Sequence, residues 1–158
     1  MTRAVIALGA NLGDARAALA GAVKAITALP GVTLLAESSV YSTAPIGGVE
    51  QPDYLNAVVT VETSLSPAEL LDCLHDIENA WHRTREVRWG PRTLDLDLID
   101  VAGVTSDDPE LTLPHPRAHE RAFVLVPWLE ADPEAELTGF GPVAALLPGL
   151  GDQGITIA

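Results

Sequence analysis

Residues 88–100 read Arg-Trp-Gly-Pro-Arg-Thr-Leu-Asp-Leu-Asp-Leu-Ile-Asp, and they carry the clearest structural pattern in the chain. From 94 to 98 leucine and aspartate alternate, which is the period of a β-strand with two different faces. We expect the leucine face to pack on a core and the opposite face to carry the carboxylates of Asp95 and Asp97. Carboxylates beside arginines can bind a metal ion and phosphate oxygens, or they can form a solvated charged surface. The spacing alone leaves both interpretations open.

The composition predicts one globular domain spanning residues 1–158. A hydrophobic fraction of 47% is sufficient for a core, and no apolar run is long enough to span a bilayer. The single cysteine, Cys73, excludes an internal disulfide and suits a reducing compartment. We therefore expect a cytoplasmic protein.

The charges are unevenly distributed along the chain. A formal net charge of −13 argues against nucleic-acid binding, which needs a positive surface. Most of the nine Lys and Arg residues nevertheless fall between positions 83 and 121. These are Arg83, Arg85, Arg88, Arg92, Arg117 and Arg121. Because guanidinium groups suit bidentate contacts to phosphate, the cluster predicts an anion site near the aspartate pair.

The order of expected elements predicts the fold class. The pattern indicates strands at 4–8, 32–41 and 55–63, a helix at 14–29, a helix that begins at Ser66, and the strand containing Asp95 and Asp97. Ser66-Pro67-Ala68-Glu69 is typical of a helix start with a capping box. The resulting strand-helix-strand-strand-helix-strand order favours an α+β, ferredoxin-like βαββαβ fold, with an antiparallel sheet and both helices on its leucine side.

Further features are expected outside this core. Gly9 and Gly13 flank a predicted strand-to-helix turn, and residues 42–53 form a Pro/Gly-rich loop typical of binding segments. Additional helices are predicted at 119–129 and 142–147, followed by an irregular tail from Pro148. The phosphate-binding loop of common kinases, the protein-kinase motifs and the zinc-protease motif are absent from the sequence.

Several motifs together resemble one enzyme family. They are Gly9-Ala10-Asn11-Leu12-Gly13, residues 38–47, Gln51-Pro52-Asp53-Tyr54-Leu55-Asn56-Ala57, residues 88–97, Pro114-His115-Pro116-Arg117 and Arg121-Ala122-Phe123-Val124-Leu125. In this order they are similar to the 6-hydroxymethyl-7,8-dihydropterin pyrophosphokinase family of folate biosynthesis, over nearly the whole chain. The resemblance implies transfer of the terminal pyrophosphoryl group of ATP to a reduced pterin, with release of AMP.

The resemblance also implies roles for individual residues. It gives as catalytic Arg83, Arg92, Asp95 and Asp97, with Asp95 and Asp97 binding two Mg²⁺ ions. The implied ATP-binding residues are Glu78, Arg83, Arg88, Trp89, Arg92, Thr112, His115 and Arg121. The implied pterin-binding residues are Thr43, Pro45, Tyr54, Asn56, Asp95 and Phe123, with Tyr54 and Phe123 enclosing the ring. The expected binding partners are ATP and the reduced pterin. We expect the protein to be a monomer that binds neither nucleic acid nor a membrane.

The chain departs from the family pattern at His82-Arg83-Thr84-Arg85, where the family commonly has Gly-Arg-x-Arg. This change concerns the loop expected to close over the substrates, not the type of reaction. Two alternative functions are also considered. A Mg²⁺-dependent phosphohydrolase or nucleotidyl transferase would use the carboxylates and arginines, but it leaves Tyr54, Asn56 and Phe123 unexplained. A non-catalytic ferredoxin-like module that senses a small ligand would need neither the metal-binding carboxylates nor the arginines.

Overall fold

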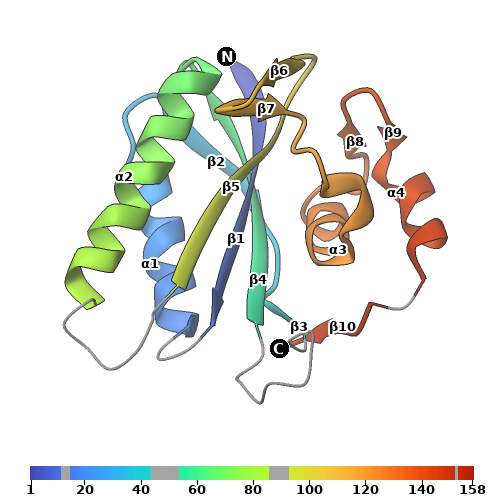
Figure 1. The fold of residues 1–158 in the computed structure, drawn as a ribbon, viewed down its shortest axis with the longest axis horizontal. Coiled ribbons are helices and arrows are strands. Elements are labelled where there is room, and N and C mark those ends of the chain that lie inside the picture. The colour runs from blue at the N-terminus through green and yellow to red at the C-terminus, as the bar shows by residue number, and fades with distance from the viewer. Residues whose placement is uncertain (12–14, 44–53, 86–92, 152) are drawn as a thin grey trace.

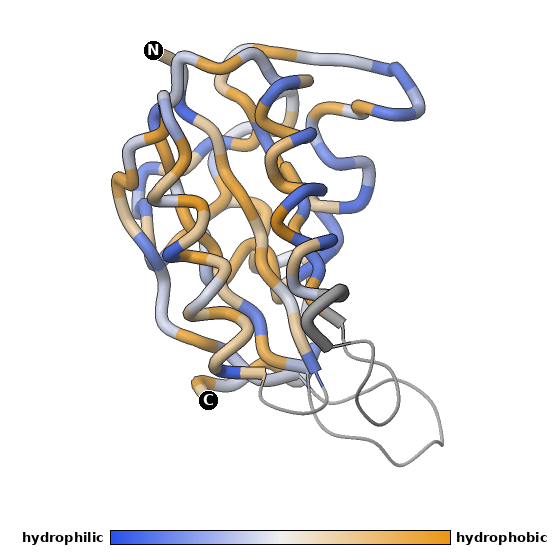
Figure 2. Tube along the Cα trace, turned by 90° about the vertical axis from the view of Figure 1, so that its left-hand side faces the viewer, coloured by the Kyte–Doolittle hydropathy of each residue, from blue (hydrophilic) through white to orange (hydrophobic). Residues whose placement is uncertain are grey.

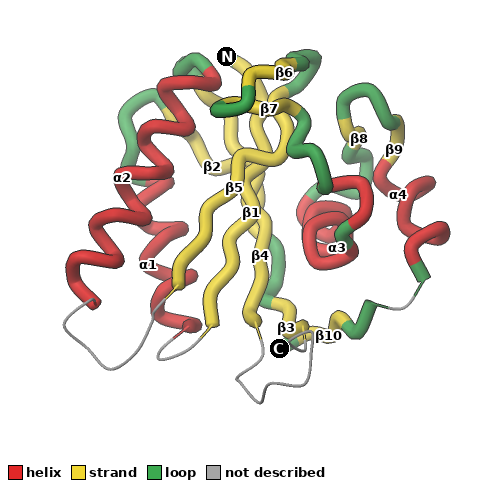
Figure 3. Tube along the Cα trace, viewed as in Figure 1, coloured by secondary structure: helices red, strands yellow, loops and turns green. Residues whose placement is uncertain are grey.

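The protein is an α+β structure built on a six-stranded sheet (Figures 1 and 3). The computed structural model describes residues 1–11, 15–43, 54–85, 93–151 and 153–158. Its strands are β1 (Thr2–Asn11), β2 (Val32–Glu37), β3 (Tyr41–Thr43), β4 (Tyr54–Thr63), β5 (Thr93–Val101), β6 (Ser106–Asp108), β7 (Leu111–Leu113), β8 (Glu136–Leu137), β9 (Gly141–Pro142) and β10 (Ile155–Ile157). Its helices are α1 (Ala15–Thr27), α2 (Pro67–Arg85), α3 (Ala122–Ala131) and α4 (Val143–Leu146), with short 3₁₀ turns at Ala118–Glu120 and Leu147–Leu150.

The main sheet has the strand order β10-β3-β4-β1-β5, and β2 also pairs with β4. All pairings in this sheet are antiparallel. The predicted α+β class with an antiparallel sheet is therefore confirmed. None of the helices in the described ranges combines the length and the hydropathy that crossing a membrane requires.

Hydrophobic residues are frequent along the strands of the sheet (Figure 2). Buried clusters lie on both faces of the sheet. One face packs against α1 and α2, and it includes the buried leucines Leu94, Leu96 and Leu98 of β5 as predicted. The opposite face includes Val5, Val58 and other residues that pack with side chains of α3. The sequence predicted helices only on the leucine side, whereas α3 covers part of the opposite face (Figure 1).

The start of α2 has the predicted capping box. The backbone N–H of Glu69 donates to Ser66 Oγ at 3.1 Å, and the N–H of Ser66 donates to Glu69 Oε1 at 2.9 Å. These hydrogen bonds satisfy a backbone donor of the first helical turn. The hydrogen bond from the backbone N–H of Ser66, and after it the Ser66 side chain, lower the pKa of the Glu69 carboxyl below its usual value. The helix start could be predicted because it depends on residues only three positions apart.

Three predicted elements differ in the structure. The strand expected at 32–41 is divided into β2 and β3, and between them Ser38 Oγ accepts a hydrogen bond from the N–H of Val58 at 2.9 Å, so a side chain replaces part of the strand ladder. The helix expected from residue 119 begins at Ala122, because Arg121 is extended with φ −113° and ψ 104°. The tail expected to be irregular contains β10, which pairs with β3.

Candidate active site

Asp95 and Asp97 lie at the end of the sheet face that α3 leaves uncovered. The antiparallel register places Asp97 opposite Ala7 and Asp95 opposite Gly9 on β1. Towards the other end of the same face, Ile99 packs in the α3 cluster. Asp95 is exposed and Asp97 is partly buried. The face is therefore apolar beneath α3 and acidic beyond it.

Gly9 separates two polar side chains of this face. It pairs with Asp95 of β5 on one side and with Asn56 of β4 on the other. A Cβ atom at Gly9 would lie 3.4 Å from Asn56 Oδ1, so a side chain here would project towards Asn56. Since adjacent strands are about 4.8 Å apart, the Asn56 and Asp95 positions are about 10 Å apart across bare backbone.

This role of Gly9 differs from the predicted one. β1 continues to Asn11, so Gly9 lies inside the strand and not in the turn that follows it. A glycine within a strand often marks a close approach of another group to the backbone. That signal was available in the sequence, and the prediction of a turn overlooked it.

Asn56 is held in place from the neighbouring strand β3. Asn56 is only 6% exposed, and its Nδ2 donates a hydrogen bond to Thr43 Oγ1 at 3.0 Å. Thr43 pairs in turn with Tyr54, at the start of β4. The structure thus brings together three residues predicted for the pterin site, and an ordered, buried amide is well suited to recognising the edge of a heterocycle.

Glu78 adds a third carboxylate beside the aspartates. From α2 it reaches the sheet edge, where its Oε2 accepts a hydrogen bond from the N–H of Leu96 at 2.8 Å. Leu96 lies between Asp95 and Asp97 in the strand, so Glu78 contacts the backbone between the two aspartates. Burial raises the pKa of Glu78, the negative charges of the two aspartates raise it further, and the Leu96 hydrogen bond opposes this shift. The edge of the sheet is consequently strongly acidic.

His115 borders the acidic end of the sheet. Its backbone N–H donates to the carbonyl of Ile99 at 2.8 Å, and its Nδ1 accepts a hydrogen bond from the N–H of Arg117 at 3.3 Å. Burial lowers the pKa of His115, as do Arg121 and Arg117, whereas Asp97 opposes the change. This shift favours the uncharged form of the ring. With Nδ1 as acceptor, its proton lies on Nε2, which can donate to an anion.

Arg121 and Phe123 flank the start of α3. The guanidinium carbon of Arg121 lies 5.4 Å from the centre of the Phe123 ring, within cation–π range. Phe123 is partly buried against the α3 cluster. Thr112 lies in the β6–β7 hairpin, where its hydroxyl donates to the carbonyl of Asp108 at 3.0 Å.

Other predicted site residues fall outside what the structure describes. Pro45, Arg88, Trp89 and Arg92 lie in ranges that are not described. Arg83 lies in α2, but its side chain is not described. Their predicted roles therefore stay predictions.

The donor set fits a hard divalent cation. Within the described ranges, no group of three or more His, Cys, Asp and Glu side chains forms a metal cluster. Mg²⁺ is usually held by one or two carboxylates, with substrate phosphates and water completing its shell. Asp95 and Asp97 supply such a pair of oxygen ligands.

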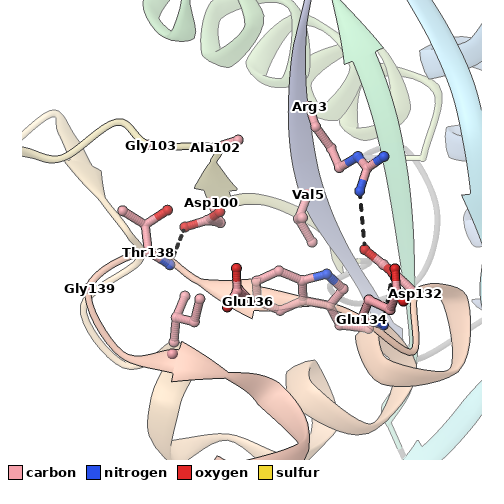
Figure 4. A pocket seen from close by; sticks show the side chains of 13 residues that line it. Arg3, Val5, Asp100, Ala102, Gly103, Asp132, Glu134, Glu136, Thr138 and Gly139 are labelled. Atoms are coloured by element: carbon pink, nitrogen blue, oxygen red, sulfur yellow. Dashed lines mark hydrogen bonds and ion pairs between the residues drawn. The ribbon is translucent and has the colours of Figure 1, made fainter.

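A separate cavity of about 410 Å³ lies between the sheet and the β8–β9 hairpin (Figure 4). It is lined in part by Arg3, Asp132 and Asp100, whose Oδ1 accepts a hydrogen bond from the N–H of Thr138 at 3.1 Å. Burial raises the pKa of Asp100. None of the described lining residues belongs to the predicted site. The candidate site is thus the polar end of the sheet and not this cavity.

The fold and the donor set define an α+β protein with an acidic candidate site for a small molecule at one end of an antiparallel sheet. Sequence comparison identifies the particular family. The profile described as 7,8-dihydro-6-hydroxymethylpterin-pyrophosphokinase (HPPK) matches residues 5–133. The chain belongs to the HPPK family.

Similar proteins agree with this assignment. A protein of Methylorubrum extorquens named 2-amino-4-hydroxy-6-hydroxymethyldihydropteridine pyrophosphokinase is 46% identical over 139 residues, covering 88% of each chain. A Bacillus subtilis protein with the same name is 45% identical over 133 residues, covering 84% of this chain and 80% of the relative.

A solved structure has a similar fold. The Plasmodium falciparum HPPK-DHPS structure with pterin and p-hydroxybenzoate superposes with a TM-score of 0.71 at 12% identity. The match covers 94% of this chain and 41% of the Plasmodium chain. At this low identity the similarity establishes the fold only.

Proposed function

We propose that this protein transfers the pyrophosphoryl group of ATP to 6-hydroxymethyl-7,8-dihydropterin, giving AMP and the pterin diphosphate, in folate biosynthesis. The observation that carries the proposal is the row Asn56–Gly9–Asp95, in a chain of the HPPK family. The hydroxymethyl oxygen attacks the β-phosphorus of ATP, the bond to the α,β-bridging oxygen breaks, and AMP leaves. The hydroxyl proton passes to solvent as the new O–P bond forms.

In this proposal the pterin binds beside the bare backbone of β1 at Gly9. Asn56 hydrogen-bonds its edge, together with backbone groups of residues 43–45, and its amide is already oriented by Thr43. Tyr54 and Phe123 enclose the ring faces. Asp95 borders both the pterin and the phosphates, which brings the hydroxymethyl group to the acidic end of the sheet.

ATP is assigned to the side of the site that carries the cationic and donor groups. His115 donates from Nε2 to a phosphate oxygen, and Arg121 pairs with the triphosphate charge. The remaining ATP-binding residues of the proposal are Glu78, Arg83, Arg88, Trp89, Arg92 and Thr112. Arg83 and Arg92 neutralise the negative charge that develops on the leaving AMP.

Asp95 and Asp97 would hold two Mg²⁺ ions together with phosphate oxygens. When bound, the ions supply charge neutralisation and alignment for an in-line displacement at phosphorus. The two carboxylates thereby determine the position of the triphosphate relative to the pterin. Glu78, held by the N–H of Leu96, supports the strand between them.

We further propose that residues 1–158 form one pyrophosphokinase domain with a ferredoxin-like core. The strand order β5-β1-β4-β2, with α1 and α2 packed on one face, supports this arrangement. The proposal includes a monomer in the cytoplasm, where the single Cys73 needs no disulfide partner. The net charge of −13 agrees with small-molecule substrates and not with nucleic acid.

The nucleotide product tests the proposed reaction. With ATP, Mg²⁺ and 6-hydroxymethyl-7,8-dihydropterin, chromatography is expected to detect AMP in amounts equal to the pterin diphosphate. Without the pterin, no AMP is expected. Formation of ADP, or nucleotide hydrolysis that does not depend on the pterin, would favour the phosphohydrolase or nucleotidyl transferase and contradict the proposal.

A further inference from the structure

The side chain of Gln153 contacts the backbone on both sides of Arg121. Its Oε1 accepts a hydrogen bond from the N–H of Ala122 at 2.9 Å, and its Nε2 donates to the carbonyl of Glu120 at 3.0 Å. Gln153 is more than 30 positions from these residues in the sequence. One amide group therefore joins the peptide groups that precede and follow Arg121.

These contacts supply a cap that the helix itself lacks. Arg121 occupies the N-cap position of α3 and makes no capping hydrogen bond with its side chain. The first N–H groups of a helix have no partner within the helix. Gln153 provides the partner for Ala122, so the start of α3 is fixed from outside. Arg121 and Phe123, whose side chains meet at 5.4 Å, both depend on the geometry of this helix start.

The same segment also reaches the opposite side of the candidate site. Directly after Gln153, β10 pairs with β3, with Ile155 opposite Thr43. Thr43 is the acceptor that orients Asn56. Residues 153–158 therefore connect the helix start that carries Phe123 with the strand that supports Asn56, and they lie beyond the residues matched by the family profile.

We propose that Gln153 is a positioning residue, which sets the placement of Arg121 and Phe123 for substrate binding. Gln153 acts through the backbone of Glu120 and Ala122 and does not itself contact the reacting atoms. The inference rests on the proposed function, because that function makes Arg121 and Phe123 binding residues.

The test replaces Gln153 by a side chain of similar length without hydrogen-bonding groups. The Gln153→Met variant should raise the KM for the pterin and for ATP roughly threefold to tenfold, as expected for the loss of such hydrogen bonds. Exchange of the Ala122 amide hydrogen, followed by NMR, should become faster. The Tm should fall by less than about 4 °C.

Two matched variants separate positioning from general stability. Ile157→Ala changes a 70% exposed side chain of the same segment and should leave both KM values and Ala122 exchange unchanged. Gln153→Glu retains an acceptor for Ala122 but loses the donor to Glu120, so its KM values should lie between those of the unmodified protein and Gln153→Met.

The measurements distinguish failure of this inference from failure of the proposed function. If Ala122 exchange is unchanged in Gln153→Met, the contact does not hold the helix start and the inference is wrong. If exchange becomes faster while both KM values stay within about twofold of the unmodified protein, Gln153 is only structural and the inference is again wrong. Failure of the unmodified protein to form AMP would overturn the proposed function, and this inference with it.

Discussion

At position 9 the absence of a side chain leaves the backbone of β1 bare between Asn56 and Asp95. The amide on one side is held by the 3.0 Å hydrogen bond from Asn56 to Thr43. In the proposed arrangement, a ring enclosed by Tyr54 and Phe123 turns its edge towards this backbone and the amide of Asn56. At the residue scale, the site therefore depends as much on a missing side chain as on those present.

The first prediction concerns Gly9→Ala. The new methyl group would meet Asn56 Oδ1 at about 3.4 Å, an ordinary contact, so the fold should tolerate it. Alanine should change the free energy of unfolding by no more than about 1 kcal/mol, since glycine is unfavourable in strands. The KM for the pterin should nevertheless rise about tenfold or more, because the methyl group occupies the floor of the site.

The matched control for this prediction is Gly21→Ala in α1. No atom lies within 4 Å of the new methyl group, so stability should rise while both KM values remain unchanged. Unchanged pterin binding by Gly9→Ala in a steady-state assay would show that the pterin does not lie over β1.

The second prediction concerns the carboxylate at position 97. Asp97→Asn retains the shape of the side chain but removes the charge that would bind Mg²⁺. Turnover should fall about a thousandfold, which corresponds to several kcal/mol of transition-state stabilisation. Asp107→Asn, on the exposed β6 strand, is the control and should keep full turnover. Near-normal single-turnover rates for Asp97→Asn would remove this residue from the metal site.

At the element scale, α3 determines how much of the second sheet face is available. Its residues Val124, Leu125 and Trp128 are buried against the sheet, and among the described residues they do not reach its acidic end. The end of α3 is fixed by Glu130, whose carboxylate accepts hydrogen bonds from Ser39 N, Ser39 Oγ and Tyr41 Oη at 3.0, 2.7 and 2.8 Å. This contact connects α3 with the start of β3, the strand that carries Thr43.

The third prediction is that Glu130→Gln weakens the attachment of α3 to β3. The hydrogen bonds, above all those from Ser39, lower the pKa of Glu130, while burial and Glu130 raise the pKa of Tyr41 to about 12. At neutral pH the variant should lose about 1 to 2 kcal/mol of stability, after allowance for solvent screening of this exposed group.

The contribution of Glu130 to stability should depend on pH in one direction. A carboxyl with a lowered pKa in the folded state stabilises the protein above its unfolded-state pKa, and this contribution is lost as the pH falls through the folded-state pKa. The difference in unfolding free energy between the two proteins should therefore shrink in acid, as measured by urea unfolding. Glu37→Gln, at an exposed position of β2, is the control. A difference independent of pH would show that the charge of Glu130 is not what holds α3.

At the scale of the whole molecule, patterns local in the sequence were predictable and long-range contacts were not. The alternation in β5 and the capping box at Ser66 depend on neighbouring residues, and both are confirmed. The pairing of β10 with β3 joins segments more than 100 positions apart, and a strand of three residues has too short a pattern to reveal it.

The candidate site likewise combines features that the sequence predicts with features that only the tertiary structure reveals. The alternation in β5 predicted that Asp95 and Asp97 share a face, and the motifs around Asn56 and Phe123 gave the family. The position of Gly9 between Asn56 and Asp95 required the register of three strands. The contact of Gln153 with the start of α3 required the tertiary structure, because nothing near Gln153 in the sequence indicates its partners.

Following the β-phosphate of ATP tests the central claim most directly. ATP carrying a radioactive β-phosphorus is incubated with the protein, Mg²⁺ and 6-hydroxymethyl-7,8-dihydropterin, and the products are separated by chromatography. Pyrophosphoryl transfer predicts that the label moves to the pterin in step with the release of unlabelled AMP. Retention of the label in ADP, or its appearance in inorganic phosphate or pyrophosphate without the pterin, would contradict the account.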